Sequence, residues 1–144
     1  MKKAKTGSGK PRSQIAALPI RRSPTGEPEL LLVTTRTTRR WIVPKGWPIK
    51  GKKNHEAAAI EAREEAGVIG KAHKKPAGRY IYWKRMNDHF VLCKVALYIL
   101  DVERRLEKWA EHNQRLSHWF TLEDAAEIVD EPGLKAAIRS LELN

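Results

Sequence analysis

The segment NHEAAAIEAREEAG, residues 54–67, carries the strongest structural signal in the chain. Asn54 is a favourable N-cap residue, and Gly67 is the residue type that most readily ends a helix in a left-handed conformation. At about 100° per residue, three small side chains share one helical face, namely those of Ala59, Ala62 and Ala66. The segment therefore predicts a helix over residues 54–66 whose small-residue face lies close against a sheet.

The same helix carries three glutamates within an arc of about 100° on the opposite side, Glu61, Glu64 and Glu65. Like charges three or four residues apart each destabilise a helix by roughly 0.2 to 0.5 kcal/mol. Glu64 and Glu65 also lie in the last turn, where the helix dipole favours cations. Such conflicts with local rules are expected at functional sites. Clustered carboxylates suit a hard divalent cation such as Mg²⁺; the alternative is a solvated acidic face screened by nearby cations.

Most of the remaining chain reads as strands. We predict an edge strand over residues 13–22, because Pro19 cannot donate a ladder hydrogen bond in a central strand. Further strands are predicted over residues 30–35, 41–44, 78–85, 90–101 and 117–120, with a loop over 44–51, a basic linker before 78, a turn over 86–89 and an ambiguous stretch over 102–115. Thr121 can cap a short helix, and Pro132 can open a last helix to Leu143. This order favours the α/β (α+β) class and a mixed sandwich.

Composition limits the possible classes of protein. The chain has 144 residues and a formal net charge of +11, from 28 Lys plus Arg against 17 Asp plus Glu. We expect a flexible basic arm over residues 1–12 and a single domain over residues 13–144. No apolar run is long enough to span a membrane. The single cysteine, Cys93, excludes an intramolecular disulfide and a cysteine zinc site, and favours a cytoplasmic location.

The positive charge is concentrated in two internal stretches. Residues 36–53 hold seven Lys or Arg and residues 71–85 hold six, and neither stretch contains Asp or Glu. A small polyanionic, phosphorylated partner is one interpretation, and nucleic acid contacted through the basic arm is another. A basic surface that only keeps the domain soluble is the third. The sequence does not indicate an oligomeric state.

The helix and the loop before it resemble the signature of the Nudix hydrolase family, G-x5-E-x7-R-E-U-x-E-E-x-G-U, where U is a bulky aliphatic residue. Without a gap, the signature is matched at Gly46, Glu61, Glu64, Glu65, Gly67 and Val68. Three positions depart from it. Lys52 stands in place of the early Glu, Ile60 in place of the Arg, and the small Ala62 in place of an aliphatic residue.

The resemblance implies roles for these residues. Glu64 and Glu65 would bind Mg²⁺ or Mn²⁺, the carbonyl of Lys45 or Gly46 would add a ligand, and Glu61 would bind metal or act as the base. The Arg of the signature helps to orient the glutamates, and Arg63 does not replace it, because it lies about 160° around the helix from Glu61. A further carboxylate ligand is expected from a distant loop, with Glu103, Glu107 and Glu111 as candidates.

Three longer stretches resemble one Nudix subgroup, the hydrolases of diphosphoinositol polyphosphates and diadenosine polyphosphates: residues 39–51, 64–70 and 109–129. This resemblance implies an α/β/α sandwich with a mixed β-sheet and hydrolysis of a phosphoanhydride by water attack at phosphorus. Candidate phosphate-binding residues are Arg39, Arg40, Lys45, Lys50, Lys52 and Lys53, with Arg79, Lys84 and Arg85 as weaker candidates. The alternative function is a nucleic-acid or polyphosphate binding module on a catalytically degenerate Nudix scaffold.

Overall fold

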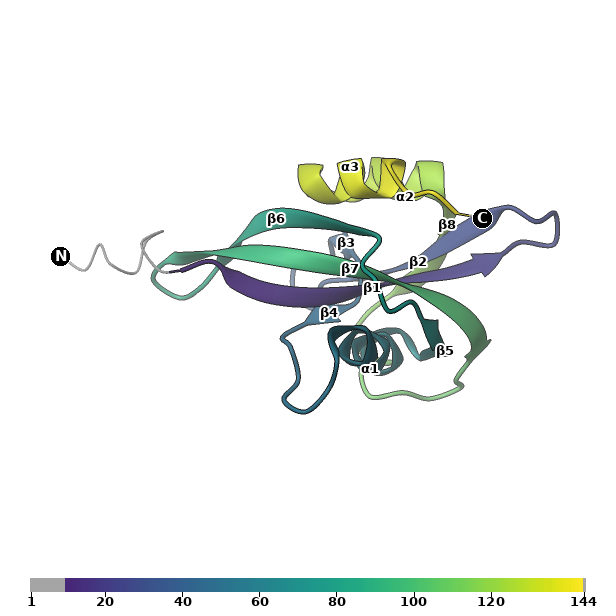
Figure 1. The fold of residues 1–144 in the computed structure, drawn as a ribbon, viewed down its shortest axis with the longest axis horizontal. Coiled ribbons are helices and arrows are strands. Elements are labelled where there is room, and N and C mark those ends of the chain that lie inside the picture. Colours follow the sequence, from purple (N-terminus) through teal and green to yellow (C-terminus); the bar gives the residue numbers. More distant parts are fainter. Residues whose placement is uncertain (1–9, 144) are drawn as a thin grey trace.

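A mixed sheet forms the middle layer of the structure, a computed structural model that describes residues 10–143 (Figure 1). The elements follow along the chain as β1 (Arg12–Arg22), β2 (Pro28–Thr34), β3 (Trp41–Ile42), β4 (Lys45–Gly46), α1 (Asn54–Ala66), β5 (Val68–Ala72), β6 (Gly78–Arg85), β7 (Phe90–Arg105), β8 (Ser117–Thr121), α2 (Leu122–Ile128) and α3 (Pro132–Arg139). Figure 1 shows α1 on one face of the sheet and α2 with α3 on the other. The predicted α/β (α+β) sandwich with a mixed sheet is confirmed.

β1 lies in the centre of the sheet, so the prediction of an edge strand was wrong. It pairs parallel with β7 and antiparallel with β4 and β2. Pro19 is tolerated because β4 pairs only with residues 15–16 and β2 only with residues 20–22. The nitrogen of Pro19 faces the same side as that of Ala17, since backbone direction alternates along a strand. It therefore falls in the gap between the two partners and removes no ladder hydrogen bond.

The two faces of the sheet build two separate cores. Side chains alternate along β1, so Ala16 and Leu18 point toward α2 and α3, whereas Ile15 and Ala17 point toward α1. On the α1 side the contact surface of the helix is made by alanines, Ala57, Ala58, Ala62 and Ala66, all fully buried. Ala59 is only half-buried. The small-residue face thus brings the α1 backbone close to the sheet, as predicted for Ala62 and Ala66.

The limits of α1 follow the prediction with one change at its start. The helix ends at Gly67, which adopts a left-handed conformation with φ of 66°. Its N-cap is Lys53 rather than Asn54, since the Lys53 backbone N–H donates a 2.8 Å hydrogen bond to Oε1 of Glu56. The Glu56 side chain thus satisfies the backbone N–H of Lys53, and the N-cap lies one residue before the predicted one.

Other predicted elements differ in extent. The basic linker contains a strand, β5, which pairs antiparallel with β7, and β7 continues to Arg105 instead of ending at Asp101. Part of the predicted 44–51 loop is the short strand β4, held by its pairing with β1. The last helix ends at Arg139 rather than at Leu143. The predicted cap of α2 is confirmed, because Thr121 Oγ1 accepts a hydrogen bond from the Asp124 N–H at 3.1 Å.

The basic arm predicted over residues 1–12 lies mostly outside the described residues. Its last residue, Arg12, is already part of β1 and pairs with Cys93 of β7. Cys93 is buried in the sheet and makes no disulfide. Among residues 10–143, no helix has both the length and the apolar character needed to cross a membrane.

Gly67 and Gly26 allow a direct test of what lies over the end of α1. Both have positive φ, but a Cβ on Gly67 would collide with the ring of Trp109, whereas a Cβ on Gly26 would meet nothing within 4 Å. We expect Gly67→Ala to lower the free energy of unfolding by about 2 to 4 kcal/mol and Gly26→Ala by about 1 kcal/mol. Urea denaturation of both variants measures this difference. Equal losses would contradict the packing of Trp109 on Gly67.

Candidate active site

A cleft of about 720 Å³ opens between α1, β4 and the segments that follow β2 and β7. Its acidic lining residues are Glu61, Glu65 and Glu111, and its cationic lining residues are Arg36, Arg40, Lys45, Lys84 and Arg115. The chain therefore brings carboxylates and cations from distant segments to one concave surface. Such a surface can hold an anionic ligand together with a cation.

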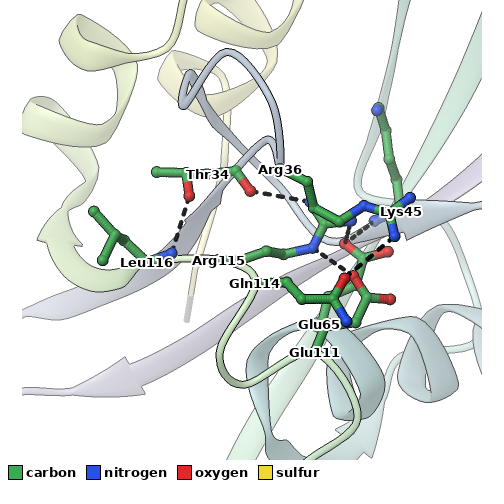
Figure 2. A network of polar contacts seen from close by, with 8 residues as sticks. All are labelled: Thr34, Arg36, Lys45, Glu65, Glu111, Gln114, Arg115 and Leu116. Carbon is green, nitrogen blue, oxygen red and sulfur yellow. Dashed lines mark hydrogen bonds and ion pairs between the residues drawn. The ribbon is translucent and has the colours of Figure 1, made fainter.

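Glu65 is the central buried acid of the cleft, with 5% of its side chain exposed. Its Oε1 accepts a 3.3 Å hydrogen bond from the Lys45 backbone N–H and lies 4.0 Å from Nη2 of Arg115 (Figure 2). Burial raises the pKa of Glu65 to about 8; the Arg115 charge opposes this rise, and a hydrogen bond with Glu61 and the charges of Glu61 and Glu111 add to it. Burial thus favours the protonated form of Glu65 in metal-free protein.

Glu61 is the partner that shares this proton. It is half-buried, and burial raises its pKa, while the hydrogen bond with Glu65 acts in the opposite direction. Gly46 of β4 faces this carboxylate at such short range that a Cβ at Gly46 would lie 2.5 Å from Oε1 of Glu61. A side chain at position 46 would force the end of the Glu61 side chain to move, so the β4 backbone and the two glutamates form one wall of the cleft.

Glu64 does not join this wall. Its side chain is exposed and lines no part of the cleft, and among residues 10–143 no group of three or more His, Cys, Asp or Glu side chains is arranged to hold a metal ion. Of the three candidates for a carboxylate from a distant loop, the structure brings in Glu111, whose backbone N–H donates to the Glu64 carbonyl at 3.0 Å. Glu103 and Glu107 are exposed outside the cleft. The role of Glu64 as a ligand stays a prediction.

The carboxylate pair fits a hard divalent cation. Glu61, Glu65 and the backbone of Gly46 offer only oxygen donors, the set that Mg²⁺ and Mn²⁺ prefer. Two carboxyl groups in contact repel each other when both are ionised, and a divalent cation between them removes that repulsion. The residues present are therefore compatible with the metal that the resemblance implies.

The predicted phosphate-binding cations divide into two groups. Arg40 and Lys45 line the cleft, and so does the weaker candidate Lys84. Lys45 is half-buried. Loss of solvent lowers the pKa of its ammonium, the nearby Lys84 lowers that pKa further, and Glu65 opposes both effects. Four other candidates are exposed and lie outside the cleft lining, Arg39, Lys50, Lys52 and Lys53.

Arg115 is the residue of this cleft that sequence reasoning missed. Its guanidinium donates from Nε to Oε1 of Glu111 at 2.7 Å and from Nη1 to the Thr34 carbonyl at 3.0 Å, and only 10% of its side chain is exposed (Figure 2). It lies in the ambiguous stretch 102–115, where no periodicity marks it. The one available signal is its position two residues before a predicted strand.

Comparisons with known proteins settle the family. A model of the NUDIX domain matches residues 10–141. The chain belongs to the Nudix family. It is 34% identical over 113 residues to Nudix hydrolase 16, mitochondrial, of Arabidopsis thaliana, covering 76% of this chain and 63% of that protein. It is 35% identical over 106 residues to human diphosphoinositol polyphosphate phosphohydrolase 3-alpha, covering 72% and 61%.

Solved structures agree on the Nudix fold. A Caenorhabditis elegans Ap4A hydrolase in a binary complex superposes with a TM-score of 0.66 at 22% identity, covering 89% of this chain and 93% of that one. A Nudix hydrolase from Nitrosomonas europaea gives a TM-score of 0.64 at 17% identity, covering 90% and 87%. These likenesses concern the fold alone. The chain spans about six-tenths of the length of the two curated relatives named above.

The Nudix signature can now be placed in space. Gly46, Glu61 and Glu65 lie together at the cleft, and Gly67 ends the helix. The departing residue Lys52 is exposed in the turn before α1, where its N–H donates to the Ile49 carbonyl at 3.0 Å. A half-buried aliphatic side chain, Ile60, occupies the position of the signature Arg and can form no ion pair.

The raised pKa of Glu65 predicts a pH-dependent stability in metal-free protein. Its folded-state pKa of about 8 exceeds the ordinary value of 4.5, so its favourable contribution is complete below pH 4.5 and is lost as the pH rises through 8. We expect Glu65→Gln to gain about 2 to 4 kcal/mol in unfolding free energy relative to the unmodified protein between pH 5 and pH 8.5.

Urea denaturation in buffers with chelator, at several pH values, measures this gain. Glu64→Gln, on the exposed side of the same helical turn, is the matched control, and its effect should be small compared with that of Glu65→Gln. A pH-independent effect of Glu65→Gln would show that Glu65 ionises normally in the folded protein.

Proposed function

We propose that this chain is a divalent-metal-dependent hydrolase that cleaves a phosphoanhydride bond by water attack at phosphorus. The substrate class is a nucleoside diphosphate derivative, a dinucleoside polyphosphate or a diphosphoinositol polyphosphate. The observation that carries the proposal is the contact between the buried Glu65 and Glu61 beside Gly46, in a cleft that also presents cations. Nudix family membership and the names of two matched proteins, a diphosphoinositol polyphosphate phosphohydrolase and an Ap4A hydrolase, support it.

The metal ligands of this proposal are Glu61, Glu65 and the Gly46 carbonyl, with Glu64 as the further signature glutamate. A bound Mg²⁺ or Mn²⁺ supplies Lewis-acid activation of the phosphoanhydride and of a water molecule. The three glutamates are the catalytic residues. Glu61 is the stronger candidate for the base, because its half-buried carboxylate lines the cleft and accepts the hydrogen bond from Glu65.

The cations of the cleft bind the phosphates. Arg40 and Lys45 line the same cavity as the glutamates, and charge-assisted hydrogen bonds to phosphate oxygens are among the strongest that a protein makes. Lys45 is held near the acids by its own strand, β4, and its Nζ lies 5.0 Å from the centre of the Tyr82 ring. A half-buried, partly desolvated ammonium interacts strongly with a phosphate that replaces its lost water.

The second candidate is a binding module without turnover. The observation that favours it is the pair of departures from the signature, Lys52 and Ile60, since the Arg that Ile60 replaces helps to orient the glutamates. Binding to nucleic acid or to polyphosphate would then rest on cationic contacts and would weaken steeply with salt. The matched relatives give no support for a nucleic-acid partner, so this candidate is an outcome of the test below.

We expect the chain to hydrolyse at least one member of a substrate panel in Mg²⁺ or Mn²⁺, covering dinucleoside polyphosphates, inositol pyrophosphates, ADP-ribose, NADH and 5′-triphosphate RNA. Chelator should abolish product release. Glu65→Gln should lower kcat/KM by about 100- to 1,000-fold, because several kcal/mol of charge stabilisation are lost. Phosphate and nucleotide release, followed by ion-exchange chromatography, measures each reaction. Salt-sensitive binding without turnover across the whole panel would favour the binding module.

Arg40 and Arg39 provide a second test, since they are adjacent in sequence but only Arg40 lines the cleft. We expect Arg40→Gln to raise the KM for the best substrate about 10-fold, the value of one charged hydrogen bond. Arg39→Gln should raise the KM by less than about 2-fold, because the Arg39 side chain lies outside the cleft lining and salt screens its charge. Steady-state kinetics at constant ionic strength distinguish the two. Similar effects of both substitutions would place the phosphate outside this cleft.

A further inference from the structure

We propose that Arg115 is the positioning residue of the catalytic glutamates and takes the part that the Nudix signature gives to an Arg at position 60. The inference rests on the proposed function, because it concerns the same carboxylates. It starts from a gap: Ile60 cannot hold a carboxylate, and Arg63 is exposed and lies about 160° around α1 from Glu61. Some other cation has to orient a buried acid at this place.

Arg115 meets the geometric requirement. Within residues 10–143, the ion pair of Glu65 is made with Arg115, at 4.0 Å, and the same guanidinium binds Glu111 at 2.7 Å. The Arg115 side chain thus lies between an acid of α1 and an acid of the loop after β7 (Figure 2). Its charge also opposes the rise in the pKa of both Glu61 and Glu65.

The main chain on both sides of Arg115 is fixed. Leu116, the next residue, is joined to Thr34 at the end of β2 by two hydrogen bonds, from the Thr34 N–H to the Leu116 carbonyl at 3.0 Å and from the Leu116 N–H to Thr34 Oγ1 at 2.9 Å. On the other side, the Gln114 backbone N–H donates a 3.0 Å hydrogen bond to the Glu111 carbonyl. Arg115 Nη1 adds its own bond to the Thr34 carbonyl. The guanidinium is therefore held in place independently of any substrate.

The shape of the side chain also matters. Nε and Nη1 of Arg115 donate hydrogen bonds to Glu111 and Thr34, and Nη2 lies 4.0 Å from Oε1 of Glu65. A planar guanidinium can serve acceptors in several directions at once, whereas a lysine ammonium is a compact point charge on a flexible stem. Lysine at position 115 should keep the charge and lose the orientation of the glutamates.

The test compares Arg115→Gln and Arg115→Lys with the unmodified protein. Substitution of a residue that orients metal ligands typically lowers metal affinity or activity by 10- to 100-fold. We expect both substitutions to weaken Mn²⁺ binding, measured by isothermal titration calorimetry, by about 10- to 100-fold and to lower kcat by a similar factor, with KM changed by less than about 3-fold. Arg139→Gln, which removes an exposed pair with Glu127, is the matched control and should change neither quantity.

The decisive variant is Ile60→Arg, which restores the signature. In the Arg115→Gln background, Ile60→Arg should raise Mn²⁺ affinity at least about 10-fold. In the unmodified protein it should raise the affinity less than about 3-fold, because Arg115 already orients the glutamates. This non-additivity also separates positioning from a general loss of folding. Thermal unfolding of each variant confirms that the proteins compared are folded.

Three results would overturn the inference. One is an Arg115→Gln protein with unchanged Mn²⁺ affinity and kcat; another is a rise in KM alone, which would make Arg115 a substrate contact. The third is an equal gain from Ile60→Arg in both backgrounds. If the substrate panel shows no turnover at all, the proposed function fails, and Mn²⁺ affinity still decides the role of Arg115: loss in Arg115→Gln with recovery by Ile60→Arg supports it.

Discussion

The burial of one carboxyl group, that of Glu65, is the constraint on which the rest of the site depends. It lies between the Lys45 backbone, the Glu61 carboxyl and the Arg115 guanidinium, each from a different part of the chain. A carboxyl group at this depth requires polar partners, because a buried polar group without a hydrogen bond is destabilising. The alanine face of α1 makes the arrangement possible, since it lets the helix approach the sheet closely enough to put Glu65 beside β4.

The cleft contains both acids and cations, although the chain as a whole has a net charge of +11. The acids of the cleft are surrounded by Arg36, Arg40, Lys84 and Arg115, so the same cavity can receive a divalent cation at its acidic wall and phosphate oxygens along its remaining wall. Lysines close in sequence, such as Lys50 and Lys52, contribute only to the field outside. The fold, and not the density of charge along the sequence, therefore decides which Lys and Arg side chains line the cleft.

The helix over residues 54–66 and its glutamates could be predicted because the signals are local: a terminating glycine and small side chains at helical spacing. The central place of β1 could not, because Pro19 excludes a central strand only where a partner needs its N–H, and the lengths of β4 and β2 decide that. Arg115 could not be predicted either, because its contacts with Thr34 and Glu65 are distant in sequence. Its bond to the Thr34 carbonyl joins residues 81 apart in sequence, and no pattern within a loop announces such a contact.

The ring of Trp109 packs on Gly67. Trp109 lies in the loop between β7 and β8, which also carries Glu111 and Arg115 to the cleft. Arg105, at the end of β7, lies 4.8 Å over that ring and donates a 2.9 Å hydrogen bond to the Ala66 carbonyl. Gly67, the glycine of the Nudix signature, thus also provides the surface on which the Trp109 ring packs. Helix termination and the position of this loop depend on the same missing methyl group, so a side chain at position 67 would strain the backbone and also displace the ring that holds the loop against α1.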